Sequence, residues 1–141
     1  MTACDGPHIV IFVHSLAVTG AVRRVVALAG AFAERGARVT LLTVHGDGGL
    51  RGEVPDTVAV ESLAPAGARA AHGGLGRAFG LVRSFPALVR ALRRLAPDIL
   101  LAGANHVHLP ACLAHAVSGR GGTRLALRLS NSLGGGTSGQ R

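Results

Sequence analysis

Several residue types that mark common functional sites are absent from this chain. The sequence has 141 residues and contains no lysine, tyrosine or tryptophan. A Walker phosphate-binding loop requires a lysine, so a nucleotide site of that kind is excluded. Proteins that bind single-stranded nucleic acid combine basic side chains with aromatic platforms. The four aromatic residues here are all phenylalanines in apolar patterns, and we therefore predict no nucleic-acid partner.

The positive charge does not change that prediction. The net charge is +8, from 15 basic and 7 acidic residues, and every basic residue is an arginine. Arginine without lysine, in a chain dominated by alanine, glycine, valine and leucine, is typical of GC-rich coding sequences. The charge therefore reflects amino-acid usage more than a particular partner, although it is compatible with an anionic membrane surface.

Cysteines and long apolar runs are also scarce. Cys4 and Cys112 are too few to form a disulfide framework, which agrees with a reducing compartment. The longest apolar runs, such as residues 9–13, are far shorter than the ~18 residues that a membrane-spanning helix needs. The N-terminus lacks the basic stretch and apolar run of an export signal. We therefore predict a cytoplasmic protein.

The first part of the chain has the pattern of a strand–helix–strand unit. Residues 8–14 are a continuous apolar run rich in β-branched side chains, which predicts a strand buried on both faces. Apolar residues at helical spacing between Val22 and Ala33 predict a helix that ends at Gly36. Residues 39–44 predict a second buried strand. Such a unit crosses over right-handed into a parallel sheet.

The rest of the chain continues this alternation. We predict a strand near a sheet edge at residues 58–63, a Gly-rich loop at 64–76, a helix at 79–95, a strand at 98–102, a helix at 109–117 and a strand at 125–129. Proline disfavours a helix interior, so an alternative is that the helix at 79–95 begins near Ser84 with Pro86 in its first turn.

These elements predict an α/β fold class, a Rossmann-like parallel sheet of about five strands with helices on both faces. We assign residues 1–131 to this domain. Residues 132–141 are rich in glycine and serine, cannot bury enough apolar surface to become ordered, and are predicted to form a disordered tail.

The loop after the first strand carries the most information about function. It has only Gly20, so the G-x-G-x-x-G motif of dinucleotide-binding folds is absent, and no G-x-S-x-G motif of hydrolases occurs in the chain. A glycine just before a buried helix exposes backbone N–H donors where the helix dipole favours an anion. A plain turn explains the same residues, and the sequence leaves both interpretations open.

Two segments resemble the retaining glycosyltransferases of family 4: IVIFVHSLAVTGAVRRVVALAGAFAERGARVTLLT, at residues 9–43, and LVRALRRLAPDILLA, at residues 88–102. In that family a strand, a glycine loop and a helix ending in a phrase like A-E-R-G precede V-T-L-L-T, and a long helix leads to a P-D strand. The resemblance implies a GT-B fold, of which this chain would be the N-terminal, acceptor-side domain.

The loops depart from the family pattern at several positions. Thr19 stands where the first loop glycine is usual, Gly20 keeps the second, and Val22 replaces an acidic or amide residue. Ser130 stands where many members carry a histidine near the transferred sugar. Ligands of open parallel sheets bind beyond the carboxyl ends of the strands. We therefore predict a cleft for acceptor and donor formed by Ser15, Gly20, Asn105, His106, Ser130 and Asn131.

The resemblance also implies a reaction and its partners. Members transfer a sugar from a nucleotide-sugar donor to a sugar or lipid-linked acceptor hydroxyl with retained configuration, and they hold no tightly bound cofactor. From their position after a strand end, Asn105 and His106 are expected to orient the acceptor hydroxyl, and an alternative for His106 is an electrostatic role. A second, C-terminal Rossmann-like domain holds the donor mainly through paired glutamates that this chain lacks, so we expect the isolated chain to be inactive. The alternative is a non-catalytic α/β binding or interaction module, or a decayed fragment.

Histidines near the predicted helix at 109–117 suggest a metal site at first sight. His108, Cys112 and His115 share one helical face, and all are permissible zinc ligands. No carboxylate stands nearby to orient a ligating imidazole, and Cys112 lies among Ala111, Leu113 and Ala114, as a small core residue would. We therefore predict no metal site.

Three arginines, Arg83, Arg90 and Arg94, line one face of the predicted helix at 79–95. A solvated helix face explains them most simply. The other hypothesis is that they face an anionic membrane, which would place the protein peripherally on the inner face of the membrane.

Overall fold

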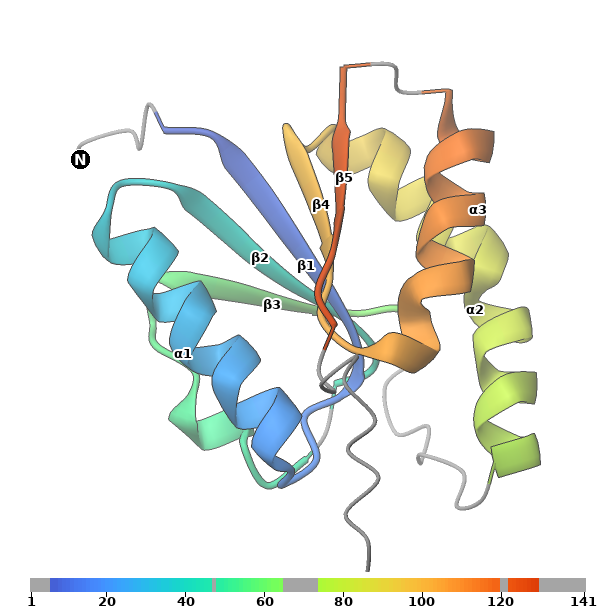
Figure 1. Cartoon of the computed structure of the whole chain (residues 1–141), viewed down its shortest axis with the longest axis horizontal. Coiled ribbons are helices and arrows are strands. Elements are labelled where there is room, and N and C mark those ends of the chain that lie inside the picture. The colour runs from blue at the N-terminus through green and yellow to red at the C-terminus, as the bar shows by residue number, and fades with distance from the viewer. Residues whose placement is uncertain (1–5, 47, 65–73, 120–121, 130–141) are drawn as a thin grey trace, which may run out of the picture.

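The computed structural model describes residues 6–46, 48–64, 74–119 and 122–129 (Figure 1). Its strands form a parallel sheet in the order β3-β2-β1-β4-β5. The strands are β1 (His8–Ser15), β2 (Arg38–His45), β3 (Val58–Ser62), β4 (Ile99–Ala102) and β5 (Arg124–Leu127). The predicted α/β fold class with a five-stranded parallel sheet is confirmed.

Helices cover both faces of the sheet, as predicted. The α-helices of the described ranges are α1 (Gly20–Glu34), α2 (Gly74–Leu95) and α3 (His108–Ser118). Figure 1 shows α1 on one face and α2 with α3 on the other. Two short 3-10 helices, η1 (Arg51–Glu53) and η2 (Asn105–Val107), follow β2 and β4.

β1 lies at the centre of the sheet because its side chains are apolar on both faces. Val10 and Phe12 pack into the core under α2 and α3, whereas Ile11 and Val13 pack into the core under α1. These four side chains are at most 1% exposed. Successive side chains of a strand point to opposite faces, so a continuous apolar run is what burial on both faces requires.

The sheet has its topological switch point between β1 and β4. The chain runs from β1 outward to β2 and β3, and then returns to place β4 on the other side of β1. β3 is therefore an edge strand, as predicted, and β5 is the other edge. Open sheets of this kind bind ligands at the carboxyl ends of the strands beside the switch point.

The alternative start of the long helix near Ser84 is wrong. α2 begins at Gly74, so Pro86 lies inside it. A proline has no N–H and leaves the carbonyl of Val82, four residues earlier, without an intrahelical partner. Pro86 and Val82 are both exposed, and water can bond the freed carbonyl. This explains why the helix continues through the proline.

Some predictions fall outside the described residues. These are most of the Gly-rich loop at 64–76, the tail at 132–141, and with it the domain boundary after residue 131. Among the helices that the structure does describe, none combines the length and apolarity needed to cross a membrane.

Candidate functional site

The predicted cleft residues that are described lie along one edge of the sheet. Ser15 ends β1, Gly20 begins α1, and Asn105 begins η2 shortly after β4. All three positions follow the carboxyl ends of neighbouring strands, in the lower part of Figure 1. The backbone of His106 belongs to η2, but its side chain lies outside the described part, as do Ser130 and Asn131.

The loop between β1 and α1 is held by local hydrogen bonds. The hydroxyl oxygen of Thr19 accepts the N–H of Val22 at 3.2 Å, which caps α1. The N–H of Leu50 donates to the carbonyl of Leu16 at 3.0 Å, so the segment after β2 braces the loop. A Cβ atom built on Gly20 would meet no atom within 4 Å. The backbone at Gly20 is therefore open to an approaching ligand.

The turn after β4 depends on a glycine. A Cβ atom on the buried Gly103 would lie 2.8 Å from Cγ1 of Val13 and 3.0 Å from Cγ2 of Val25. The N–H of Gly103 donates to the carbonyl of Phe12 at 2.9 Å. This close contact with β1 and α1 places the exposed Asn105 at the same edge as the first loop.

Two histidines without a sequence motif also lie at this edge. His14 is buried near the end of β1, and His45 ends β2. Their ring centroids are 5.5 Å apart, with an angle of 62° between the ring planes. Each histidine lies at or next to the end of a largely apolar strand, so the pattern gave no functional signal. Only the pairing of β1 with β2 shows that the two rings meet.

Arg128 is a further residue of this edge that the sequence patterns did not single out. It directly follows β5, is half-buried, and its Nη1 donates to the carbonyl of Gly103 at 3.3 Å. Within the predicted strand at 125–129 an arginine is expected simply to face outward. The sequence feature that could have identified Arg128 as a site residue is its position as a basic residue at the carboxyl end of a parallel strand.

The three permissible metal ligands are not arranged around a common point. Nε2 of His108 lies 3.0 Å from the carbonyl oxygen of Arg128, and Nε2 of His115 lies 2.6 Å from that of Thr123. These ring nitrogens hold α3 against the segment around β5. Over the described ranges no three His, Cys, Asp or Glu side chains form a group that could hold a metal ion.

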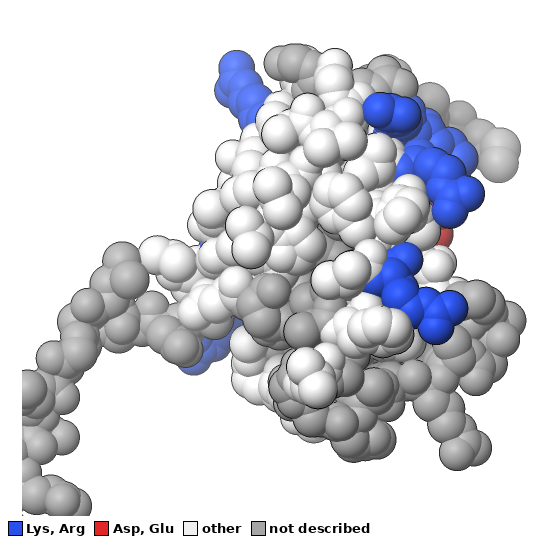
Figure 2. Space-filling model, turned by 90° about the vertical axis from the view of Figure 1, so that its right-hand side faces the viewer, with Lys and Arg blue, Asp and Glu red and all other residues white. Residues whose placement is uncertain are grey.

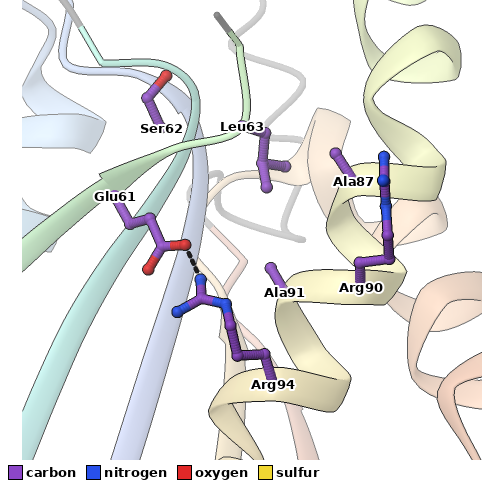
Figure 3. Close-up of a pocket in the computed structure, with 7 residues that line it drawn as sticks. All are labelled: Glu61, Ser62, Leu63, Ala87, Arg90, Ala91 and Arg94. Atoms are coloured by element: carbon purple, nitrogen blue, oxygen red, sulfur yellow. Dashed lines mark hydrogen bonds and ion pairs between the residues drawn. The ribbon is translucent and has the colours of Figure 1, made fainter.

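The arginines of α2 have different surroundings. Arg83 is exposed, and Nε of Arg90 donates to the carbonyl of Pro86 at 3.3 Å. Arg94 forms an ion pair with Glu61 of β3, and Figure 3 shows this pair bridging the strand and the helix. Arg90 and Arg94 also line a pocket of about 300 Å³ between the end of β3 and α2. Glu61 therefore offsets part of the positive charge of this face.

The outer face of α2 and α3 carries an apolar groove. Leu109, Leu113 and Val117 of α3 and Val82 of α2 are all at least half exposed. A groove of about 340 Å³ between the helices is lined by Val82, Phe85, Pro86, Leu109, Pro110 and Leu113. In Figure 2 this face is largely uncharged, with arginines at its margin.

The fold and its open carboxyl edge define an α/β domain of the kind that forms the N-terminal half of GT-B glycosyltransferases. The family model described as Glycosyltransferase Family 4 matches residues 18–128. The chain therefore belongs to Glycosyltransferase Family 4, which confirms the resemblance seen in its loops and helices.

Solved structures of glycosyltransferases share the fold. MurG from Acinetobacter baumannii superposes with a TM-score of 0.62 at 18% identity, over 92% of this chain and 36% of that chain. A glycosyltransferase from Rickettsia africae ESF-5 superposes with a TM-score of 0.58 at 13% identity, over 87% of this chain and 29% of that chain. The present chain thus spans about a third of the length of these two proteins. No curated protein sequence matches it significantly.

Proposed function

We propose that this chain is the acceptor-side domain of a retaining glycosyltransferase, which transfers a sugar from a nucleotide-sugar donor to an acceptor hydroxyl. The family match over residues 18–128 carries the proposal. The accessible backbone at Gly20 and the exposed Asn105 support it, because doubly wound sheets bind ligands at this edge.

In this proposal the cleft residues have distinct tasks. The side-chain amide of Asn105 has both donors and an acceptor, so it can fix the orientation of an acceptor hydroxyl. Ser15 and Gly20, beside the neighbouring strand β1, would line the same cleft. His106, Ser130 and Asn131 stay predicted cleft residues, because their side chains lie outside the described part of the chain. The reaction would need no tightly bound cofactor or metal.

The proposal includes a second domain. The two similar solved structures are about three times as long as this chain. We infer that a C-terminal Rossmann-like domain holds the nucleotide of the donor. The isolated chain would then supply only one wall of the cleft and would not transfer sugar.

The first test compares the chain alone with the chain joined to the second domain. Mass spectrometry of cell extracts establishes which form is made, and transfer of labelled sugar from UDP- and GDP-sugars is then measured. We expect transfer only when both domains are present, with an NMR coupling constant in the product that shows retained configuration. A product of 14.2 kDa that accumulates alone and supports no transfer would favour the alternative, a non-catalytic binding module or a decayed fragment.

A variant of the two-domain form tests the cleft itself. Asn105→Ala should lower kcat/KM by about 10-fold or more, which corresponds to one hydrogen bond lost from the transition state. Asp56→Asn is the matched control, because Asp56 is exposed and precedes β3 at the opposite edge of the sheet. Equal activity of the two variants would remove Asn105 from the proposed cleft.

We also propose that the face of α2 and α3 contacts an anionic membrane surface, with the protein on the cytoplasmic side. Exposed apolar side chains beside basic ones suit the boundary between lipid headgroups and acyl chains. Neither helix contains an aspartate or a glutamate, so no residue of α2 or α3 itself repels an anionic lipid. Arg83, Arg90 and Arg94 would contact the headgroups.

Vesicle sedimentation tests this partner. The parent chain should bind vesicles that contain phosphatidylserine, and the triple variant Arg83→Ala, Arg90→Ala, Arg94→Ala should lose most of that binding. The matched control replaces three exposed arginines elsewhere, Arg24, Arg35 and Arg51, by alanine. No binding by the parent, or the same loss in the control, would contradict the proposal.

A further inference from the structure

The backbone of Arg128 is held by hydrogen bonds on both sides. Its N–H donates to the carbonyl of Ala102 at 3.0 Å, and its own carbonyl accepts Nε2–H of His108 at 3.0 Å. Both backbone groups of the residue are therefore held, one by β4 and the other by α3. The position from which the side chain extends is therefore fixed relative to β4 and α3.

The side chain turns from β5 toward the end of β4. Its Nη1 donates to the carbonyl of Gly103 at 3.3 Å, which is near the upper limit for such a bond. Gly103 in turn lies against Val13 of β1 and Val25 of α1. The guanidinium group is thus directed along the carboxyl edge toward the switch point between β1 and β4.

The charge of Arg128 has no carboxylate partner among the described residues. The ion pairs found there join Arg23 to Glu53 and Arg94 to Glu61. The guanidinium of this half-buried residue has several remaining N–H donors, which suit two parallel hydrogen bonds with an oxyanion such as a phosphate.

We propose that Arg128 is a binding residue for the phosphate groups of a substrate at the carboxyl edge of the sheet. This inference rests on the proposed function, in which substrates enter at this edge, and it adds the chemical group that is recognised there. Two substrates carry such a group. The nucleotide-sugar donor contains a diphosphate, and a lipid-linked acceptor contains a phosphate. The guanidinium would bind either one through charge-assisted hydrogen bonds.

The experiment measures anion binding directly, without sugar transfer. The chain labelled with ¹⁵N is titrated with inorganic pyrophosphate at constant ionic strength, and the Nε–H signal of Arg128 and the neighbouring amide signals are followed by NMR. Arg128→Gln should weaken binding at least about 10-fold, a ratio that corresponds to ~1.4 kcal/mol. Arg128→Lys keeps the charge without the planar fork and should give an intermediate value.

Arg124→Gln is the matched control. Arg124 lies on the same strand, is exposed, and begins β5 at the opposite edge of the sheet. The Arg124→Gln variant removes the same charge from the chain as Arg128→Gln and should leave pyrophosphate binding unchanged. Circular dichroism of each variant confirms that the fold is retained.

Titration with UDP and with geranyl phosphate then separates the two substrates. Tighter binding of UDP that depends on Arg128 assigns the site to the donor, and tighter binding of geranyl phosphate assigns it to the acceptor. The proposal is overturned if the parent binds no pyrophosphate, or if Arg124→Gln weakens binding as much as Arg128→Gln. Anion binding by the chain and sugar transfer by the two-domain form are measured separately. Arg128-dependent binding together with no transfer by the two-domain form would contradict the proposed function and leave this inference standing.

Discussion

At the residue scale, His8 is a titratable group built into the interior. Its Nδ1 donates to the carbonyl of Leu95 at 3.2 Å, and its Nε2 lies 3.0 Å from the hydroxyl of Thr40. These partners suit the neutral imidazole, with one donor and one acceptor nitrogen. Burial, together with the charge of Arg38, lowers the pKa of His8 below its ordinary value of 6.5, although the Leu95 carbonyl and Asp98 act in the opposite direction.

We expect His8 to make the fold less stable in mild acid. The unfolded chain takes up a proton near pH 6.5, whereas folded His8, with its lowered pKa, does so only at lower pH. The contribution of His8 is thus complete above the unfolded value and falls as the pH decreases toward the folded value. Urea denaturation at about pH 7.5 and about pH 5 should show a smaller decrease in the free energy of unfolding for His8→Gln than for the parent. An unchanged decrease would assign the effect to other histidines.

Also at the residue scale, Gly103 allows the turn after β4 to pack closely against β1 and α1. Gly103→Ala forces a methyl group against Val13 and Val25, and overpacking of this kind costs about 1–3 kcal/mol of the free energy of unfolding. Gly52→Ala is the control, because a Cβ atom there meets no atom within 4 Å. Chemical denaturation measures the free energy of unfolding of both variants. Equal values would show that β4 can shift to accommodate the methyl group without loss of stability.

At the element scale, the start of α1 depends on its cap. Thr19 has the extended backbone of an N-cap, and its hydroxyl accepts the N–H of Val22. Thr19→Ala should lower the free energy of unfolding by about 1 kcal/mol. Thr19→Ser keeps the hydroxyl and should retain most of that stability in the same thermal or urea denaturation. If the serine variant is as unstable as the alanine variant, the hydroxyl does not act as the cap.

The same scale shows which elements a sequence can predict. Each described strand and α-helix overlaps a predicted element, because apolar periodicity follows directly from which faces are buried. The start of α2 was missed, because its first turns contain glycine and lack a clear apolar stripe. The alternative start near Ser84 gave too much weight to the cost of Pro86, which the exposed side of the helix tolerates.

At the scale of the whole molecule, stability is expected to decrease from the centre of the sheet to its edges. β1 pairs with strands on both sides and has both faces buried, whereas β3 and β5 pair on one side only. Backbone amides open locally at a lower cost where packing is sparse. Hydrogen–deuterium exchange followed by NMR should therefore be slowest in β1 and faster in β3 and β5. Equal protection across the five strands would mean that the sheet opens only as one unit.

The sequence by itself determined the fold class, the burial of β1 on both faces and the family. Apolar patterns of period 2 and period 3.6 each lie within a short stretch of sequence, and so do the motifs typical of the family. Both can therefore be recognised without the tertiary structure. The sequence also indicated that Ser15, Gly20 and Asn105 lie at or after strand ends. These positions are cleft candidates because open parallel sheets bind ligands beyond the carboxyl ends of their strands.

Only the tertiary structure decided which of those ends are neighbours and what they contact. The order β3-β2-β1-β4-β5 brings His14 to His45 and directs Arg128 toward Gly103. It also brings Nε2 of His115 to the carbonyl of Thr123 and pairs Arg94 with Glu61. Each contact joins residues on separate elements, and their distance depends on strand order and helix packing. Local periodicity does not encode either of these.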